Sequence, residues 1–340
     1  MPTITCYLSL VFALGLLGSC PSWAAEAQPL TAGAQFAACD SLQIGQDDSS
    51  DARLCLQGLA WPAAEFAVTL EPPQVPHGDW LVRFPSARPS GEGINDQVAV
   101  EWYQVRDDTG QVAQAPAAVI LHESGSGMTV GRLLAKALRA RGIHSFLVQL
   151  PYYGVRRPNS SKPTGEKLAE ALCQSVCDAR RAYDAVTCLP GVDADRISLH
   201  GISLGGFVTA TTAGLDRAYQ QVFVLLAGGD LYGVLMHGQQ DAAKVRQAFL
   251  ADGTRPEEVQ AMLQRIEPLR LAHRIDPQRL WLFSGRFDDV VPPKHAHALA
   301  EAAGLSDDHH IRLLATHYSG IIFLPAICDQ ICQQIQREAP

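Results

Sequence analysis

Short apolar runs alternate with amphipathic stretches along most of the chain. Strand-like runs occur at residues 80–84, 98–105, 117–121, 145–150, 196–200, 222–226, 279–283 and 311–314. Helix-like stretches at residues 130–141, 167–186 and 207–212 separate several of them. The first two runs resemble an antiparallel pair, whereas the later runs are apolar enough to be strands buried on both faces. With right-handed crossovers, this rhythm predicts an α/β fold with a doubly wound, mostly parallel sheet.

Two parts of the chain depart from this rhythm. Residues 229–276 carry two helix-like segments, at 241–250 and 256–265, which predicts a small helical insertion above the sheet. Residues 25–78 are rich in Ala, Gln, Asp and Pro, so we expect an irregular N-terminal arm packed on the main domain. Residues 79–340 are then the single large α/β domain, since 340 residues with 47% hydrophobic content can bury a full core.

The start of the chain predicts export. Residues 1–24 carry no charged side chain, and an apolar stretch at about residues 7–17 precedes several small residues. This pattern is typical of a signal peptide, cut after Ala24 or Ala27, and of a secreted or periplasmic protein. An alternative is a lipoprotein anchored through Cys20, because Leu-Gly-Ser-Cys resembles a lipoprotein processing site. The stretch is short for a membrane span, and no later segment is apolar enough to be one.

Charge and cysteine content narrow the classes of partner. Twenty-seven basic residues against 35 acidic ones, with no basic run, argue against nucleic-acid binding. Loss of the signal peptide would leave seven of nine cysteines, and an oxidising compartment favours a Cys39–Cys55 disulfide. We expect the other cysteines to be structural, with at least one unpaired, and we expect no metal and no cofactor. No sequence feature specifies an oligomeric state.

A Gly-x-Ser-x-Gly motif at residues 201–205 is the strongest chemical signal. It lies between a strand-like run and a helix-like stretch, where a tight turn thrusts the serine out at the top of the sheet. The flanking positions need glycine because a Cβ there would clash. Ser203 is therefore the candidate nucleophile. The backbone N–H of Leu204, at the helix start, is a candidate oxyanion donor.

A second glycine-rich loop follows the strand-like run at residues 117–121. Its sequence, His-Glu-Ser-Gly-Ser-Gly at 122–127, lets the backbone approach a tetrahedral intermediate closely. We expect the N–H of Ser124 to be the second oxyanion donor. Glu123, beside it, is a candidate substrate contact. It could also hold this loop, bias the protonation of the nucleophile, or form a scaffold salt bridge.

An acid and a base follow later strands in the same relation. Asp288 comes just after the strand-like run at 279–283, with Asp289 and Asp230 as rivals, and His317 follows the run at 311–314. The carboxyl ends of parallel strands share one edge of a sheet, where functional groups gather. A neutral imidazole there can take the serine proton while a carboxylate fixes its tautomer. The order Ser203, Asp288, His317 predicts a serine-hydrolase triad.

These motifs resemble the α/β-hydrolase superfamily over about residues 79–336. The resemblance rests on the Gly-x-Ser-x-Gly motif at 201–205, on the Asp-x-x-Val-Pro pattern at 288–292 and on His317. A narrower likeness, to dienelactone-hydrolase-like proteins and acyl esterases, rests on residues 84–86, 95–101, 121–123 and 151–158. Dienelactone hydrolases themselves carry cysteine where Ser203 stands. The resemblance implies a serine esterase acting on a small or polymer-borne ester.

Residues 151–158 follow a strand and should border the substrate pocket. Tyr153 is a candidate substrate contact, and Arg156 and Arg157 could grip a carboxylate or phosphate group. The alternative is that these arginines pair with acids of the scaffold and that the tyrosine packs. Two other functions remain open, a serine peptidase of the prolyl-oligopeptidase type and a catalytically silent binding protein.

Overall fold

A ten-stranded mixed sheet forms the centre of the fold. The structure is a computed structural model that describes residues 30–158, 163–251 and 253–336. Its strand order is β1-β2-β3-β4-β6-β5-β7-β8-β9-β10. The strands are β1 (Gln35–Cys39), β2 (Glu65–Glu71), β3 (Trp80–Pro85), β4 (Gln97–Tyr103), β5 (Ala115–Leu121), β6 (His144–Gln149), β7 (Val192–Ile202), β8 (Gln221–Leu225), β9 (Leu280–Gly285) and β10 (His310–Leu313). β1 to β4 and the β4–β6 pair are antiparallel, and all other neighbours are parallel.

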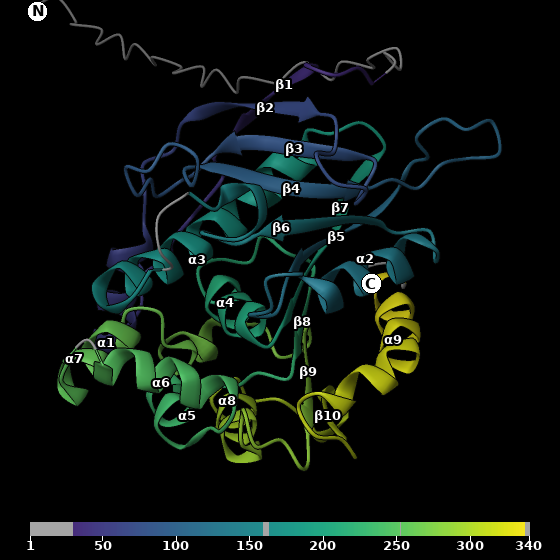
Figure 1. Ribbon diagram of the computed structural model, residues 1–340. Helices are drawn as coiled ribbons and strands as arrows, with labels where there is room; N and C mark the ends of the chain where they lie inside the picture. The colour runs from purple at the N-terminus through teal and green to yellow at the C-terminus, as the bar shows by residue number, and fades with distance from the viewer. Residues whose placement is uncertain (1–29, 159–162, 252, 337–340) are drawn as a thin grey trace, which may run out of the picture. The chain divides into compact units, whose positions relative to one another are not determined.

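Helices cover both faces of the sheet, so the predicted doubly wound arrangement is confirmed. α2 (Thr129–Arg139) and α9 (Leu324–Gln336) pack together on one face. α3 (Gly165–Thr187) and α4 (Leu204–Ala213) pack together on the other, with α8 (Pro293–Ala302) further along the sheet (Figure 1). β5 is buried at all seven positions, as a central strand covered on both faces should be.

The segment before β3 is not an irregular arm, so that prediction is wrong for its described part. β1 and β2 extend the sheet beyond β3, and α1 (Ser50–Leu59) packs on α3. Along β2, Phe66, Val68 and Leu70 are buried and alternate with more exposed neighbours. This two-residue period is the signal of a half-buried strand. It is only seven residues long and is followed directly by prolines, which hides it in a polar composition.

The predicted Cys39–Cys55 disulfide is also wrong. Cys39 is exposed at the end of β1, whereas Cys55 is buried on α1 and donates its Sγ hydrogen to the carbonyl of Arg265 at 3.1 Å. Burial raises the pKa of the Cys55 thiol to about 12. All seven cysteines in the described part of the chain are free thiols. Strand pairing, rather than a covalent bridge, therefore joins the early segment to the domain.

The helical insertion between β8 and β9 is larger than predicted by one helix. It contains α5 (Leu231–His237), α6 (Asp241–Ala251) and α7 (Pro256–Gln264), followed by the short 3-10 helices η2 (Pro268–Arg270) and η3 (Ala272–Arg274). α6 and α7 match the two predicted segments. Asp230 caps the start of α5, and its side chain accepts a hydrogen bond from the Gly233 N–H at 3.0 Å.

Two predictions concern the ends of the chain. The signal peptide and the alternative anchor at Cys20 lie outside the described residues. Within residues 30–158, 163–251 and 253–336, no helix has the length and apolar character required to cross a bilayer.

Candidate active site

Ser203 lies in the tight turn between β7 and α4. Its backbone has φ 52° and ψ −112°, a conformation that costs a non-glycine residue strain, and its N–H donates to the Leu225 carbonyl at 2.9 Å. A Cβ at Gly201 would lie 2.2 Å from the Gly205 carbonyl oxygen, and one at Gly205 would lie 2.2 Å from the Leu121 carbonyl oxygen. Both flanking positions therefore require glycine, for the steric reason that the motif suggests.

Ser203, His317 and Asp288 form one hydrogen-bonded relay. The Nε2 atom of His317 lies 2.9 Å from the Ser203 Oγ atom, and its Nδ1 atom lies 2.7 Å from Oδ2 of Asp288. The other Asp288 oxygen accepts hydrogen bonds from the N–H groups of Val290 and Val291 at 2.9 and 2.8 Å. The Asp288 carboxylate accepts a hydrogen bond from the Nδ1–H group of His317. Nε2 then carries no proton and can accept a hydrogen bond from the serine hydroxyl.

The two rival acids are engaged elsewhere. Asp289 accepts a hydrogen bond from the Gln240 side chain at 3.2 Å, which directs it toward the insertion. Asp230 caps α5 and lies 3.3 Å from the Nδ1 atom of His295. Neither makes a hydrogen bond or ion pair with His317 among the described residues.

The two expected oxyanion donors come from loops that touch. The Gly205 N–H, one residue after Leu204, donates to the His122 carbonyl at 3.0 Å and so ties the start of α4 to the loop that carries Ser124. Within the described residues, neither the Leu204 N–H nor the Ser124 N–H makes a hydrogen bond. Both N–H groups are therefore available for the oxyanion stabilisation that the sequence predicts.

His122 anchors this loop, although the sequence alone gave it no function. Its Nε2 atom accepts the Leu150 N–H at 3.1 Å, and its Nδ1 atom lies 2.6 Å from the Glu123 carbonyl. Burial lowers the pKa of His122 to about 4, so the ring is neutral at pH 7 and can accept the Leu150 proton. The available signal was its place as the first polar residue after the fully apolar β5.

Glu123 and Tyr153 hold the same loop from two sides. The carboxylate of Glu123 accepts the N–H groups of Val130 and Gly131, both at 3.0 Å, and so caps the start of α2. The Tyr153 hydroxyl donates to the Ser124 carbonyl at 3.1 Å, and its ring packs edge-on against His122. Of the functions considered for Glu123, its contacts fit holding the loop, not a scaffold salt bridge.

The prediction that Arg156 binds substrate is wrong. Its side chain is fully buried and pairs with Asp178 at 2.7 Å, and it also donates to the carbonyls of Asn95 and Gln149. All three guanidinium nitrogens thus donate to the scaffold, where an unpaired buried charge would be very costly. Arg157 is exposed and makes no side-chain hydrogen bond or ion pair within the described residues. The alternative of scaffold pairing therefore holds for Arg156 and not for Arg157.

A contact that the sequence did not reveal joins the histidine loop to the insertion. Tyr318, directly after His317, packs edge-on against the imidazole with ring centroids 5.6 Å apart. Its hydroxyl donates to Oδ2 of Asp241, at the start of α6, at 3.2 Å. Residues 77 positions apart meet here, so no local sequence pattern could have indicated the pair.

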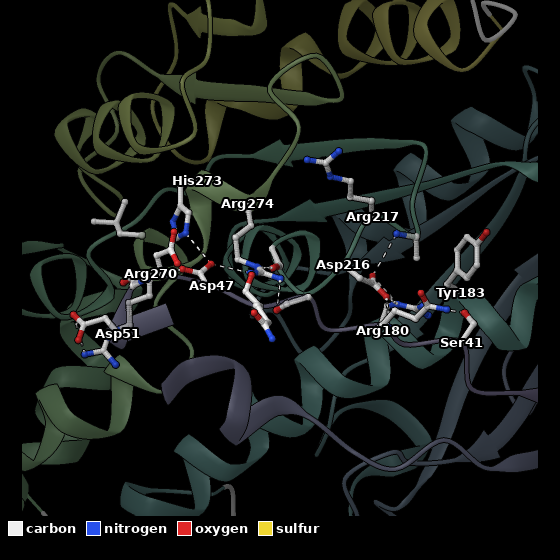
Figure 2. A pocket seen from close by; sticks show the side chains of 18 of the residues that line it. Ser41, Asp47, Asp51, Arg180, Tyr183, Asp216, Arg217, Arg270, His273 and Arg274 are labelled. Carbon is white, nitrogen blue, oxygen red and sulfur yellow. Dashed lines mark hydrogen bonds and ion pairs between the residues drawn. The ribbon is translucent and has the colours of Figure 1, made fainter. Parts of the chain in front are cut away.

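A large cavity of about 1220 Å³ lies away from these residues. Figure 2 shows its charged lining, which includes Asp47, Arg180, Asp216 and Arg274. Several lining residues precede β7, β8 and β9, so the cavity lies toward the amino ends of the strands, whereas the relay lies at the carboxyl ends. Most of its charges are paired, for example Arg180 with Asp216 at 2.8 Å. The cavity is not part of the candidate active site.

One protein-family model matches the region of the chain that carries the relay. Residues 174–320 match the model of the prolyl oligopeptidase family, and this range includes Ser203, Asp288 and His317. No curated protein sequence matches the chain.

Solved structures with similar folds are esterases and peptidases. An acetyl xylan esterase from Paenibacillus sp. R4 superposes with a TM-score of 0.59 at 16% identity, covering 86% of this chain and 96% of that one. Acetyl xylan esterase 1 from Thermoanaerobacterium sp. JW/SL YS485 gives 0.57 at 15% identity, covering 87% and 97%. A puromycin-hydrolyzing peptidase from Mycobacterium tuberculosis gives 0.55 at 18% identity, covering 80% and 46%. These matches establish the α/β-hydrolase fold for this chain.

Proposed function

We propose that this protein is a serine hydrolase that cleaves carboxylic esters through an acyl-enzyme. The proposal rests on one observation, the unbroken relay from the Ser203 hydroxyl through His317 to Asp288, with distances of 2.9 and 2.7 Å. Serine is a weak nucleophile until an adjacent base takes its proton, and this arrangement supplies that base.

Each step of the reaction has a residue suited to it. The Ser203 Oγ atom attacks the ester carbonyl as His317 Nε2 accepts its proton, and the Asp288 carboxylate stabilises the imidazolium that forms. The N–H groups of Leu204 and Ser124 receive the oxyanion, and loss of one such donor costs about 100-fold to 1000-fold in rate. His317 then protonates the leaving alcohol and activates the water that releases the acid.

A serine peptidase is the second candidate, and one observation favours it. The family match at residues 174–320 is to prolyl oligopeptidases. Against it, residues 31–78 add β1 and β2 to the sheet and pack α1 on α3, so they belong to the same compact unit as the relay and form no separate domain. Two solved structures of similar fold that align over nearly the whole of both chains are acetyl xylan esterases by name. We therefore favour an ester as the substrate.

The proposal is tested with a fluorescent fluorophosphonate and p-nitrophenyl acetate. The protein should label once, at Ser203, and hydrolyse the ester, whereas Ser203→Ala should do neither. Ser126→Ala is the matched control, because it removes only an exposed hydroxyl from the same glycine-rich loop, at a residue with no function in the mechanism. It should retain activity within about threefold, since that hydroxyl has no catalytic function in this mechanism.

Two results would contradict the assignment. Labelling that persists in Ser203→Ala would identify another nucleophile. Faster hydrolysis of aminoacyl p-nitroanilides than of p-nitrophenyl acetate would favour the peptidase.

A further inference from the structure

A carboxylate from the helical insertion stands close to the proposed general base. Asp241 is the first residue of α6, and its Oδ2 atom accepts the Tyr318 hydroxyl at 3.2 Å. The Tyr318 ring meets the His317 ring at 84°, with centroids 5.6 Å apart. One tyrosine side chain thus spans the distance from the imidazole to this carboxylate.

The charge of Asp241 also affects Tyr153, which contacts the Ser124 loop. Burial raises the pKa of Tyr153, and the negative charges of Glu123 and Asp241 raise it further. Tyr153 belongs to the wall that holds the Ser124 loop, whereas Tyr318 belongs to the His317 loop. The Asp241 carboxylate therefore lies close enough to both loops to influence them, and it contacts the His317 loop directly through the Tyr318 hydroxyl.

Three other carboxylates near the relay are already engaged. Asp288 is bound to His317, Asp289 to the Gln240 side chain, and Glu123 to the backbone of α2. The partner of Asp241 is different in kind, because Lys244 is itself 76% exposed and lies one turn along the same helix, at 2.8 Å. Exposed pairs of this type contribute little free energy, so the lysine can be displaced into water at small cost.

Asp241 has the properties of a recognition group. Its side chain is 40% exposed, and its hydrogen bond to Lys244 chiefly lowers its pKa, with smaller contributions from Tyr318 and His317. It is therefore ionised at neutral pH. The neighbouring Tyr318 is 49% exposed and presents an aromatic ring beside the carboxylate. A carboxylate next to an open tyrosine ring is a good environment for an organic cation.

We propose that Asp241 and Tyr318 bind a cationic group of the substrate, an ammonium or quaternary ammonium carried a few atoms from the ester carbonyl. This inference rests on the proposed esterase function and assigns its substrate class. On binding, the substrate cation takes the place of Lys244 on the carboxylate, and no bond is made or broken in this exchange.

The test compares two acetate esters of equal shape and different charge, acetylcholine and 3,3-dimethylbutyl acetate. The wild-type protein should favour acetylcholine in kcat/KM by about tenfold, the range expected of a half-exposed charge pair supplemented by a cation–π contact. Asp241→Asn should bring the ratio to within about threefold of one. Lys244→Met should raise the ratio above wild type, because the competing cation is gone.

Two controls separate recognition from support of the fold. Asp289→Asn removes a nearby acid whose side chain binds Gln240, and it should leave the ratio unchanged. Tyr318→Phe keeps the ring and removes the hydrogen bond to Asp241, so the preference for the cation should persist. If Asp241 only held Tyr318 in place, Tyr318→Phe and Asp241→Asn would instead have equal effects on both esters.

The outcomes distinguish this inference from the proposed function. A wild-type ratio near one, or a ratio that Asp241→Asn leaves unchanged, overturns the cation site. So does failure to hydrolyse both acetates by a protein that hydrolyses p-nitrophenyl acetate, and in both cases the esterase assignment stands. Inactivity toward p-nitrophenyl acetate as well, without fluorophosphonate labelling, overturns the esterase assignment itself.

Discussion

The two edges of the parallel sheet are built by different rules. At the amino edge, the turns that enter β5, β6, β7 and β10 use glycine wherever the backbone needs positive φ, at Gly110, Gly142, Gly191 and Gly304. At the carboxyl edge, the segments that leave β5, β6, β7 and β8 contain non-glycine residues with positive φ, namely Met128, Tyr152, Ser203, Leu226 and Asp230. The strained backbone is thus concentrated at the edge that carries the relay.

This difference shows where the chain tolerates backbone strain and which contacts hold the strained residues in place. A non-glycine residue at positive φ costs about 1–2 kcal/mol, so surrounding contacts must hold it there. Ser203 N–H donates to Leu225, Leu226 N–H donates to Phe283 at 2.7 Å, and Tyr152 N–H donates to the Asn95 side chain at 3.0 Å. At the amino edge, by contrast, buried ion pairs such as Arg180–Asp184 stabilise the scaffold without strained turns. Substitutions at the amino edge are therefore expected to change stability without changing activity.

The largest expected effect is on activity alone, at the carboxyl edge. Asp288→Asn keeps a similar shape but removes the charge that fixes the His317 tautomer and stabilises the imidazolium. We expect kcat for p-nitrophenyl acetate to fall by about 10⁴-fold, as in serine hydrolases that lose this carboxylate. The urea midpoint should change little. A loss under tenfold would mean that another acid orients the histidine, and Asp289→Asn in the same background would test the nearest one.

A pair of glycine substitutions compares the edges directly. At Gly205 an added Cβ meets the Leu121 carbonyl oxygen at 2.2 Å, backbone against backbone, so Gly205→Ala should cost at least about 3 kcal/mol of unfolding free energy and abolish labelling of Ser203. At Gly142, φ is 81° and the Cβ would enter open space. Gly142→Ala should therefore cost only the conformational strain, about 1–2 kcal/mol.

Urea denaturation and fluorophosphonate labelling, measured on both variants, check this pair. Gly142→Ala should label at the wild-type rate. Slow labelling of Gly142→Ala would show that the edges are not independent, and equal destabilisation by the two substitutions would contradict the steric argument for Gly205.

The sequence predicted the carboxyl edge better than the molecule's periphery. β5, β8, β9 and the second half of β7 are largely apolar and buried on both faces, and each such run can be recognised from its own sequence. The fold implied by them brings Ser203, Asp288 and His317 to one edge, since parallel strands share a direction. β2 shows the limit, because its seven residues alternate inside a polar, proline-bounded segment.

Contacts between distant loops could not be predicted in the same way. Arg156 follows the end of a strand, as pocket residues often do. It is nevertheless buried, and its partner Asp178 lies in the middle of α3. Tyr318 and Asp241 meet only because the insertion folds back toward the histidine loop. Local sequence patterns specify the helices and strands and their order. Whether a polar side chain is buried or lines a pocket depends on partners that only the completed fold brings close to it.

The smallest expected effect is on stability alone, at the amino edge, and depends on pH. The Arg274 guanidinium, at 2.8 Å, lowers the pKa of Asp47 from 3.8 to about 2, aided by Ser49 and His273. A depressed pKa means that the folded state favours the ionised form. Its contribution is therefore complete above about pH 4 and disappears as the pH falls toward 2.

Asp47→Asn should accordingly be less stable than wild type at pH 7, by on the order of 1 kcal/mol for a pair at the protein rim. The gap between the two urea midpoints should narrow between pH 4 and pH 2.5, because wild type then loses the same charge. Hydrolysis of p-nitrophenyl acetate at pH 7 should not change, since Asp47 lies at the edge opposite the relay. A gap that stays constant with pH would assign the effect of Asp47 to its shape and hydrogen bonds rather than its charge, and altered hydrolysis would show that the two edges communicate.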